Sequence, residues 1–158
     1  MQEVFIWLGL YEKYNIKYWP LGGDIMSGLD LSVFSERNQV FAIVDADPGS
    51  STQRTRFIRK CNSNQIPCYQ LKRYSIENYF AIKAIRKIFP NQIPRSITQL
   101  DPNKSVDEQI GFKDKNKSIK AKNRYIIKEM NLSDLEGTDL LEYLRDIANK
   151  LQSSSNDT

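Results

Sequence analysis

Residues 40–49 read Val-Phe-Ala-Ile-Val-Asp-Ala-Asp-Pro-Gly, and this stretch decides the expected fold. An unbroken apolar run with β-branched members is typical of a strand buried on both faces of a parallel sheet. The run stops at Asp45-Ala46-Asp47, and Pro48-Gly49 then favours a turn. Because ligand sites in parallel sheets lie at the carboxyl ends of the strands, this boundary is the first place to look for chemistry.

Helical and strand-like patterns alternate on both sides of this stretch. The order predicts an α/β fold with a mostly parallel sheet flanked by helices. Helices are expected over residues 4–14, 24–37, 51–62 and 76–89, and strands over residues 16–21, 40–44 and 66–71.

The remainder of the chain is expected to be helical. Residues 2–90 form the predicted α/β core, and residues 91–116 are predicted to be a loop with at most a short helix. Residues 117–151 form a C-terminal helical part, with helices over 118–130 and 138–151. The Ser/Asn-rich residues 152–158 are expected to be a disordered tail.

Composition narrows the class of protein. The chain has 158 residues, of which 40% are hydrophobic and 27% charged, as in one globular domain. It contains no run of about 20 apolar residues and no signal-peptide pattern, so we expect a cytosolic protein without a membrane span. With no histidine and only Cys61 and Cys68, it offers few ligands for zinc and no disulfide framework. The net charge of +4 suits a polyanionic partner.

Acidic residues follow two neighbouring strands. Asp45 and Asp47 point to the same side, roughly 7 Å apart along an extended chain, and their mutual repulsion favours a bound cation. Oxygen ligands of this kind select Mg²⁺ or Mn²⁺. Ser75 and Glu77 repeat the spacing after the next strand and could complete the site. A turn at residues 45–49 and a helix cap at Ser75 explain the same residues without a metal.

Other residues are weaker candidates. Gly22 and Gly23 follow the strand predicted over 16–21, so they form either a tight turn or a wall of the site. Tyr74, Tyr79 and Phe80 could stack on bases, although packing in the core explains them more simply. Four basic side chains could contact phosphates or form a solvated face, namely Arg54, Arg56, Arg59 and Lys60.

In order, Leu21-Gly22-Gly23, Val44-Asp45-Ala46-Asp47 and Tyr74-Ser75-Ile76-Glu77-Asn78-Tyr79 resemble the TOPRIM domain of the OLD (overcoming lysogenization defect) family of ATP-dependent nucleases. The C-terminal domains of related AAA/ABC-type ATPases in phage-defence systems are also similar. The resemblance covers roughly residues 2–150.

The resemblance implies a metal-dependent DNA endonuclease domain. Asp45, Asp47 and Glu77 would bind two Mg²⁺ or Mn²⁺ ions, and Ser75 would assist. A lysine on a later helix would take part in catalysis, and among Lys117, Lys120 and Lys122 we favour Lys120. The implied partners are DNA and an upstream ATPase domain or separate ATPase chain, and a homo-oligomer is a further option.

The sequence departs from the family in two places. The first strand of the family's domain, whose glutamate is a metal ligand, has no counterpart here, and the nearest acid is Glu3 in a predicted helix. A glycine-rich phosphate loop is also lacking. We therefore expect a fragment that needs its missing part for full nuclease activity, with an exposed sheet edge that makes it poorly soluble or recruits another strand.

Two rival hypotheses remain open. The chain could be a catalytically inactive module that binds nucleic acid or a partner protein. Alternatively, it could be a phosphoryl-transfer domain that uses an aspartate as the nucleophile, a mechanism that has no need of Glu77. Binding of a divalent ion separates the first rival from the nuclease hypothesis, and the position of Glu77 relative to Asp45 separates the second.

Overall fold

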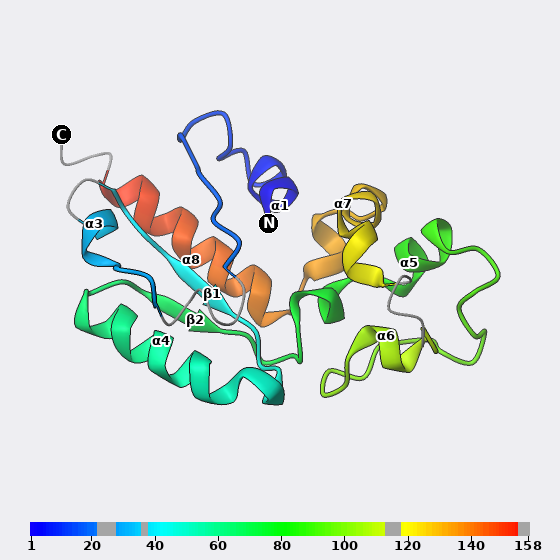
Figure 1. Ribbon diagram of the computed structural model, residues 1–158. Coiled ribbons are helices and arrows are strands. Elements are labelled where there is room, and N and C mark those ends of the chain that lie inside the picture. Colours follow the sequence, from blue (N-terminus) through cyan, green and yellow to red (C-terminus); the bar gives the residue numbers. More distant parts are fainter. Residues whose placement is uncertain (22–27, 36–37, 113–117, 155–158) are drawn as a thin grey trace.

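The computed structural model describes residues 1–21, 28–35, 38–112 and 118–154. Within these ranges it is a mixed α/β protein (Figure 1). None of the described helices is long and apolar enough to cross a bilayer. The elements are α1 (Gln2–Trp7), α3 (Ser32–Ser35), β1 (Ala42–Val44), η1 (Pro48–Ser50), α4 (Ser51–Ser63), β2 (Cys68–Gln70), η2 (Ile76–Tyr79), α5 (Ile82–Ile88), α6 (Val106–Gln109), η3 (Ile119–Lys122), α7 (Asn123–Ile126), η4 (Ile127–Glu129), η5 (Leu132–Leu135) and α8 (Asp139–Ser154).

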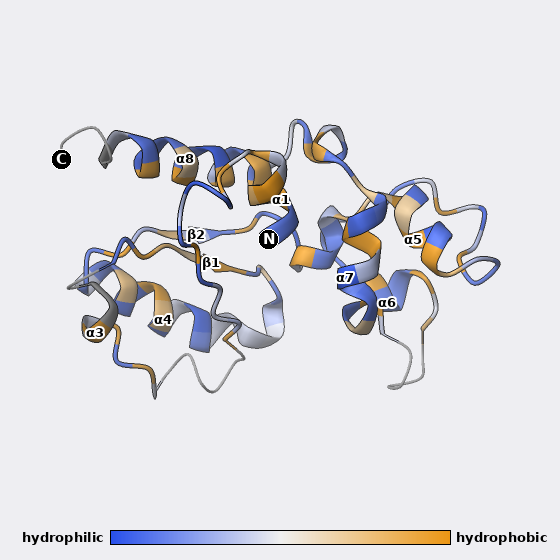
Figure 2. Ribbon diagram, turned by 90° about the horizontal axis from the view of Figure 1, so that it is seen from above, coloured by the Kyte–Doolittle hydropathy of each residue, from blue (hydrophilic) through white to orange (hydrophobic). Residues whose placement is uncertain are grey.

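The described part of the chain contains a two-stranded parallel sheet. β1 pairs with β2 in the register Ala42↔Cys68 and Val44↔Gln70, and α4 forms the connection between them. The sheet lies between α4 and α8 in both ribbon views (Figures 1 and 2). The strand–helix–strand order around residues 40–71 is thus confirmed, although both strands are shorter than expected and the described sheet is smaller than the mostly parallel sheet predicted.

Side chains alternate between the two faces of this sheet, as the pleat of a strand requires. Ile43, Tyr69 and Leu71 join the hydrophobic cluster that includes the buried face of α8. Val44 and Cys68 pack instead with Phe57 of α4. Both faces of β1 therefore contact a hydrophobic cluster, but only Val44 is fully buried, whereas Ala42 and Ile43 are partly exposed, so the predicted burial is confirmed only in part.

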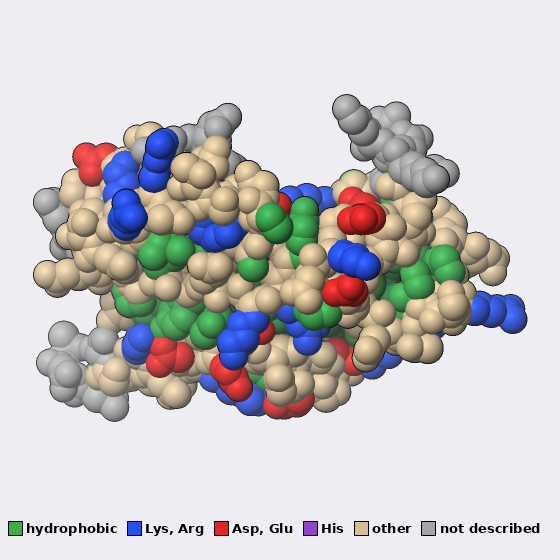
Figure 3. All heavy atoms as spheres, turned by 90° about the horizontal axis from the view of Figure 1, so that it is seen from below, with side chains coloured by type: hydrophobic (Ala, Val, Ile, Leu, Met, Phe, Trp, Pro, Cys, Tyr) green, Lys and Arg blue, Asp and Glu red, His purple; other side chains and the backbone are tan. Residues whose placement is uncertain are grey.

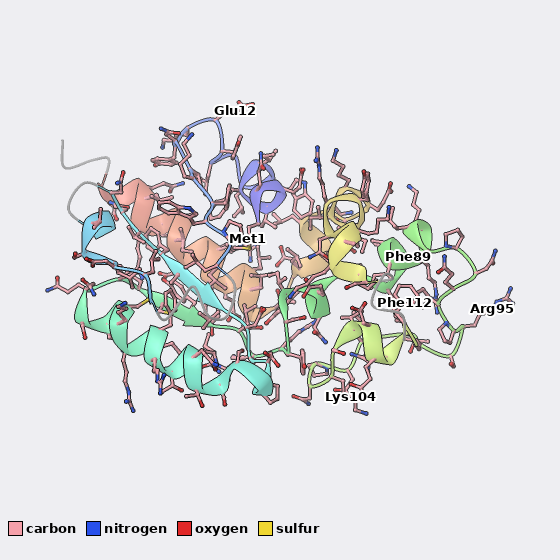
Figure 4. All side chains as sticks on the ribbon, in the orientation of Figure 1. Met1, Glu12, Phe89, Arg95, Lys104 and Phe112 are labelled. Atoms are coloured by element: carbon pink, nitrogen blue, oxygen red, sulfur yellow. The ribbon has the colours of Figure 1, made fainter. Side chains whose placement is uncertain are left out.

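The larger hydrophobic cluster extends well beyond the sheet. Its buried members include residues of α1, α5, α7 and α8, Tyr69 of β2 packs against them, and α8 turns its hydrophobic residues toward the strands (Figure 2). At the other end of the molecule Phe89 and Phe112 meet edge to face, with ring centroids 5.1 Å apart (Figure 4). The sheet and the C-terminal helices therefore share one core.

The N-terminal segment differs from the prediction. The helix expected over residues 4–14 ends at Trp7, because Gly9 adopts a left-handed φ of +67°. Leu10 N–H then donates to Phe5 O and Gly9 N–H to Ile6 O, both at 2.9 Å, which closes the helix as a Schellman motif. Residues 16–21 are not a strand, and their Pro20 has no N–H to donate to a sheet.

The helix predicted over residues 76–89 is interrupted. Phe80 and Ala81 have extended ψ angles of 135° and 131° and separate η2 from α5. The break coincides with buried polar contacts, since Tyr79 donates its hydroxyl to Asp139 Oδ1 at 2.8 Å. Asp139 also accepts the Lys72 N–H at 2.8 Å, so the chain after β2 is fastened to the start of α8.

The C-terminal predictions are partly correct. The short helix allowed within 91–116 is α6, whereas the helix expected over 118–130 is a succession of η3, α7 and η4. The helix expected over 138–151 continues to Ser154, so the prediction of a disordered tail is wrong for residues 152–154. Of the helix expected over 24–37, residues 24–27 and 36–37 lie outside the described residues, as do residues 155–158. Within residues 28–35 the structure has the short helix α3 and a non-helical stretch at 29–31, so the continuous helix predicted there is wrong.

Replacing Leu144 by alanine should destabilise the protein strongly, because this side chain is 0% exposed at the centre of the shared core. We expect a loss of about 2–5 kcal/mol in the free energy of unfolding, measured by urea denaturation. Val33→Ala is the control, since Val33 is 68% exposed and its change should stay within about 0.5 kcal/mol. Equal losses for the two variants would contradict this location of the core.

Candidate functional site

The ends of β1 and β2 are joined directly by a side chain. Asp45 is the first residue after β1, and its Oδ1 accepts the backbone N–H of Ile76 at 3.0 Å. Ile76 begins η2, which follows β2 after a short bent segment at residues 71–75. This bond brings the Asp45-x-Asp47 and Ser75-x-Glu77 segments together at one edge of the sheet.

Asp45 lies in an environment that disfavours its charge. Burial raises the pKa of its carboxyl group above the ordinary aspartate value, and the negative charge of Glu77 raises it further. The Ile76 N–H and the charge of Lys120 act in the opposite direction without reversing the shift. Glu77, Lys120 and Asp45 are thus close enough to interact electrostatically.

Asp47 is held in a different way. Its Oδ1 accepts the Gly49 N–H at 2.9 Å and so caps η1. Burial acts to raise the pKa of this carboxyl group, but hydrogen bonds from Ser50, Gly49 and Tyr74 outweigh it and hold the pKa below its usual range. The turn interpretation of residues 45–49 is therefore correct for Asp47. The lowered pKa also means that the carboxyl group of Asp47 ionises more readily than an ordinary aspartate.

Glu77 is almost fully buried, with 5% of its surface exposed. Its Oε1 accepts a hydrogen bond from Asn123 Nδ2 at 2.8 Å. The neighbouring Ser75 and Asn78 form a capping box at the start of η2, as the helix-cap interpretation of Ser75 predicted.

Asn78 supports this arrangement from behind. It is 1% exposed, and its Oδ1 accepts both the N–H and the hydroxyl of Ser75 at 3.1 Å. Its Nδ2 donates to Asp101 O and Lys104 O at 2.9 Å. A buried amide with both ends satisfied fixes η2 against the loop that precedes α6.

The segments after β1 and β2 form two walls of the site, and α6 and η3 form a third. Asp107 accepts the Ser118 hydroxyl at 2.7 Å and the Ile119 N–H at 2.8 Å, so the carboxylate anchors the start of η3. Lys120 follows on η3. These walls enclose a pocket of about 270 Å³, lined by Asp45, Asp47, Tyr74, Ser75, Glu77, Ser105, Val106, Asp107, Ile119 and Lys120.

The acidic side chains surround this pocket without converging on one point. Among the described residues, no three acidic or cysteine side chains are placed so that they could hold one metal ion together. Hydrogen bonds account for this placement, because Asp47 faces the Gly49 N–H and Asp107 uses both oxygens on η3. The oxygen donors suit a hard divalent cation, but tight ligation requires Asp47 to rotate away from its turn.

Five candidate site residues line the same pocket: Asp45, Asp47, Ser75, Glu77 and Lys120. Gly22, Gly23 and Lys117 lie outside the described residues. Lys122 is not among the pocket residues, and its ammonium group lies 5.2 Å from the ring centroid of Tyr125.

The basic residues of α4 do not behave as one group. Arg54 was predicted to contact nucleic acid, but it is only 9% exposed and donates to Asp47 O at 2.7 Å, so it braces the acidic turn. Lys60 donates to Leu29 O. Arg56 and Arg59 are exposed. Tyr79 belongs to the core, as its simpler interpretation predicted.

Sequence reasoning missed Asp107, Ser105 and Asn123, which lie 28–46 residues beyond Glu77 along the chain. No local spacing connects them to the two strand ends. Tyr74 was considered only for stacking on bases, whereas its hydroxyl bonds to Asp47.

No protein-family model, curated protein or solved structure matches this chain significantly. The fold and the site define only a class, namely a mixed α/β protein with an acidic pocket at the carboxyl ends of two parallel strands. Lys120 also lines this pocket.

Asp45→Asn should stabilise the metal-free protein at neutral pH. Asparagine can still accept the Ile76 N–H, but it carries no charge beside Glu77. The raised pKa of Asp45 means that the unfolded chain releases this proton first, so the wild type loses stability as pH rises through the folded-state pKa.

The measurement is thermal unfolding with a chelator at about pH 7 and about pH 4. The variant should gain about 2–4 °C for each kcal/mol of repulsion removed, and the gain should shrink at the lower pH, where the protonated wild-type side chain is also neutral. A variant that is less stable than the wild type at neutral pH would contradict the assigned repulsion.

Proposed function

We propose that this chain is a divalent-metal-dependent phosphodiester hydrolase domain that cuts a nucleic-acid backbone, with DNA as the substrate. The proposal is supported by one observation above all: Asp45, Asp47, Ser75, Glu77 and Lys120 line a single pocket at the carboxyl ends of β1 and β2. These residues come from three separate parts of the chain.

The electrostatics of the pocket support a cation ligand. Burial and Glu77 disfavour the charged form of Asp45, and a divalent cation between the two carboxylates would relieve that repulsion. Oxygen ligands alone, with no histidine in the chain, suit Mg²⁺ or Mn²⁺. When bound, two such ions would activate a water molecule and neutralise charge on the phosphate group.

The side chains around the pocket have distinct roles in this proposal. Asp45 and Glu77 would be the principal ligands, because the Ile76 N–H and the Asn123 amide hold them at the pocket wall. Asp47 would join them after leaving Gly49, and the Ser75 hydroxyl oxygen could accept a hydrogen bond at the site. Lys120 would stabilise negative charge on the phosphoryl oxygens.

The resemblance to OLD-family TOPRIM domains leads to two further proposals. The domain would work together with an ATPase, either as part of the same polypeptide or as a separate chain. Its biological role would be in phage defence. In the described residues β1 pairs with β2 only, which is compatible with a further strand on the other edge of β1.

The site can be tested by comparing Asp45→Ala and Glu77→Gln with the wild type. Mn²⁺ should raise the melting temperature of the wild type, because a ligand at 100 times its Kd stabilises the folded state by about 2.7 kcal/mol. The rise should be much smaller in the two variants. Cleavage of plasmid DNA should fall by about 100-fold or more, as is usual when one charge-stabilising group is removed.

Glu12→Gln is the matched control, since Glu12 lies on the N-terminal segment and does not line the pocket (Figure 4). Equal cleavage by the wild type and Asp45→Ala would reject the assigned site. If the wild type binds DNA but Mn²⁺ does not change its melting temperature, the result would favour a non-catalytic binding module.

The exposed arginines of α4 offer a separate test of the substrate. Arg56 and Arg59 remain available to phosphates, and α4 starts immediately after the acidic turn. Basic side chains occur at several places on the face seen in Figure 3, interspersed with acidic ones.

Replacing both arginines by glutamine should weaken DNA binding at every sequence tested. It should also reduce the slope of log K against log salt by about 2, because each phosphate contact contributes about 0.9 to that slope. The measurement is fluorescence anisotropy at several salt concentrations. An unchanged salt slope would show that this surface of α4 does not contact the backbone.

A further inference from the structure

Asn123 presents an unusual hydrogen-bonding state. Its Oδ1 is the one buried side-chain nitrogen or oxygen within the described ranges that has no hydrogen-bond partner. Its Nδ2 donates to Glu77 Oε1 at 2.8 Å. Rotating the amide by 180° would place its oxygen against the carboxylate, so the contact with Glu77 determines which way Asn123 faces.

Such an arrangement is unfavourable for folding. A buried acceptor without a partner costs about 1–3 kcal/mol, and an apolar residue of the same shape would avoid that cost. The amide of the neighbouring Asn78, in contrast, has a partner at both its oxygen and its nitrogen. The unpaired acceptor offsets much of what the Asn123–Glu77 hydrogen bond contributes to stability, and the group that Asn123 contacts is the most buried carboxylate of the pocket.

The backbone around Asn123 is fixed relative to the site. Asn123 begins α7 three residues after Lys120, and η3 between them is anchored by Asp107 through Ser118 and Ile119. Ile126, one turn further along, is 0% exposed in the core. The contacts of Asp107 on one side and of Ile126 on the other therefore fix the position from which the Asn123 amide contacts Glu77.

We propose that Asn123 is the positioning residue for Glu77. Its amide N–H holds the Glu77 carboxylate at the pocket wall, in the orientation needed to ligate a divalent cation. Its carbonyl oxygen remains an acceptor for a water molecule that enters with that cation. This inference rests on the proposed metal-dependent function, and it adds to it the residue that orients one ligand from outside the pocket.

The test compares Asn123→Leu with the wild type in two measurements, Mn²⁺ affinity by titration calorimetry and the metal-free melting temperature. Leucine has a similar shape but can neither donate to Glu77 nor leave an acceptor unpaired. Mn²⁺ affinity should fall by about 10–100-fold, as is typical when the hydrogen-bond partner of a ligand is lost. The metal-free melting temperature should change little, because removing the unpaired acceptor offsets the hydrogen bond that Glu77 loses. Asn62→Leu, an exposed asparagine on α4, is the control.

A double-mutant cycle with Glu77→Gln tests whether Asn123 acts through Glu77. Once Glu77 is replaced, Asn123→Leu should reduce Mn²⁺ affinity by less than about twofold further, because the two side chains work as one unit. Additive losses would overturn the proposal. A Mn²⁺ affinity of Asn123→Leu within about twofold of the wild type would also overturn it.

Two further outcomes are decisive. If the metal-free melting temperature of Asn123→Leu falls as far as that of Leu144→Ala, Asn123 is a structural residue and the proposal fails. If Asn123→Leu does not fold, Asn123→Ala is judged by the same criteria. A wild type that binds no Mn²⁺ would instead overturn the proposed function, whereas normal Mn²⁺ binding with an unaffected variant overturns this inference alone.

Discussion

The parallel pairing of β1 with β2 is the constraint on which the site depends. Because α4 connects β1 and β2 as parallel strands, the carboxyl ends of both strands lie at the same edge of the sheet. The Ile76 N–H then bonds to Asp45 across the two ends. Asp45 and Glu77, 32 residues apart in the sequence, become electrostatic neighbours as a direct consequence.

Buried polar contacts keep this edge in place where the sheet itself is small. Asn78 ties η2 to the loop at residues 101–104, and Asp139 ties the chain after β2 to α8. Asp107 does the same for η3. Asp47 is held differently, by the Gly49 N–H of its own turn, by Arg54 of α4 and by the Tyr74 hydroxyl. Asp47 must move for tight metal ligation, and this movement would break its hydrogen bond with the Gly49 N–H.

Local sequence patterns gave correct information where one physical cause dominated. The apolar run at residues 40–44 formed β1 over its last three residues, where hydrophobic clusters contact both faces, and the helical pattern at 51–62 became α4 with nearly the expected bounds. The patterns at 4–14, 16–21 and 76–89 failed for other reasons. Gly9 ends α1 through its left-handed backbone, Pro20 has no N–H for a sheet, and the Tyr79–Asp139 contact coincides with the break between η2 and α5.

The sequence by itself determined the two acidic segments and their place after neighbouring strands, because residue spacing and the pleat of a strand are local properties. Only the tertiary structure decided which other groups meet them. Asp107 reaches the pocket, and Asn123 reaches Glu77 from outside it, through the folding of α6, η3 and α7 onto η2, and no spacing in the sequence encodes such contacts. Lys120, which the family resemblance had favoured, lines the pocket for the same reason. Burial likewise turned Arg54 from an expected phosphate contact into a brace for Asp47, since packing and not composition sets which charges face water.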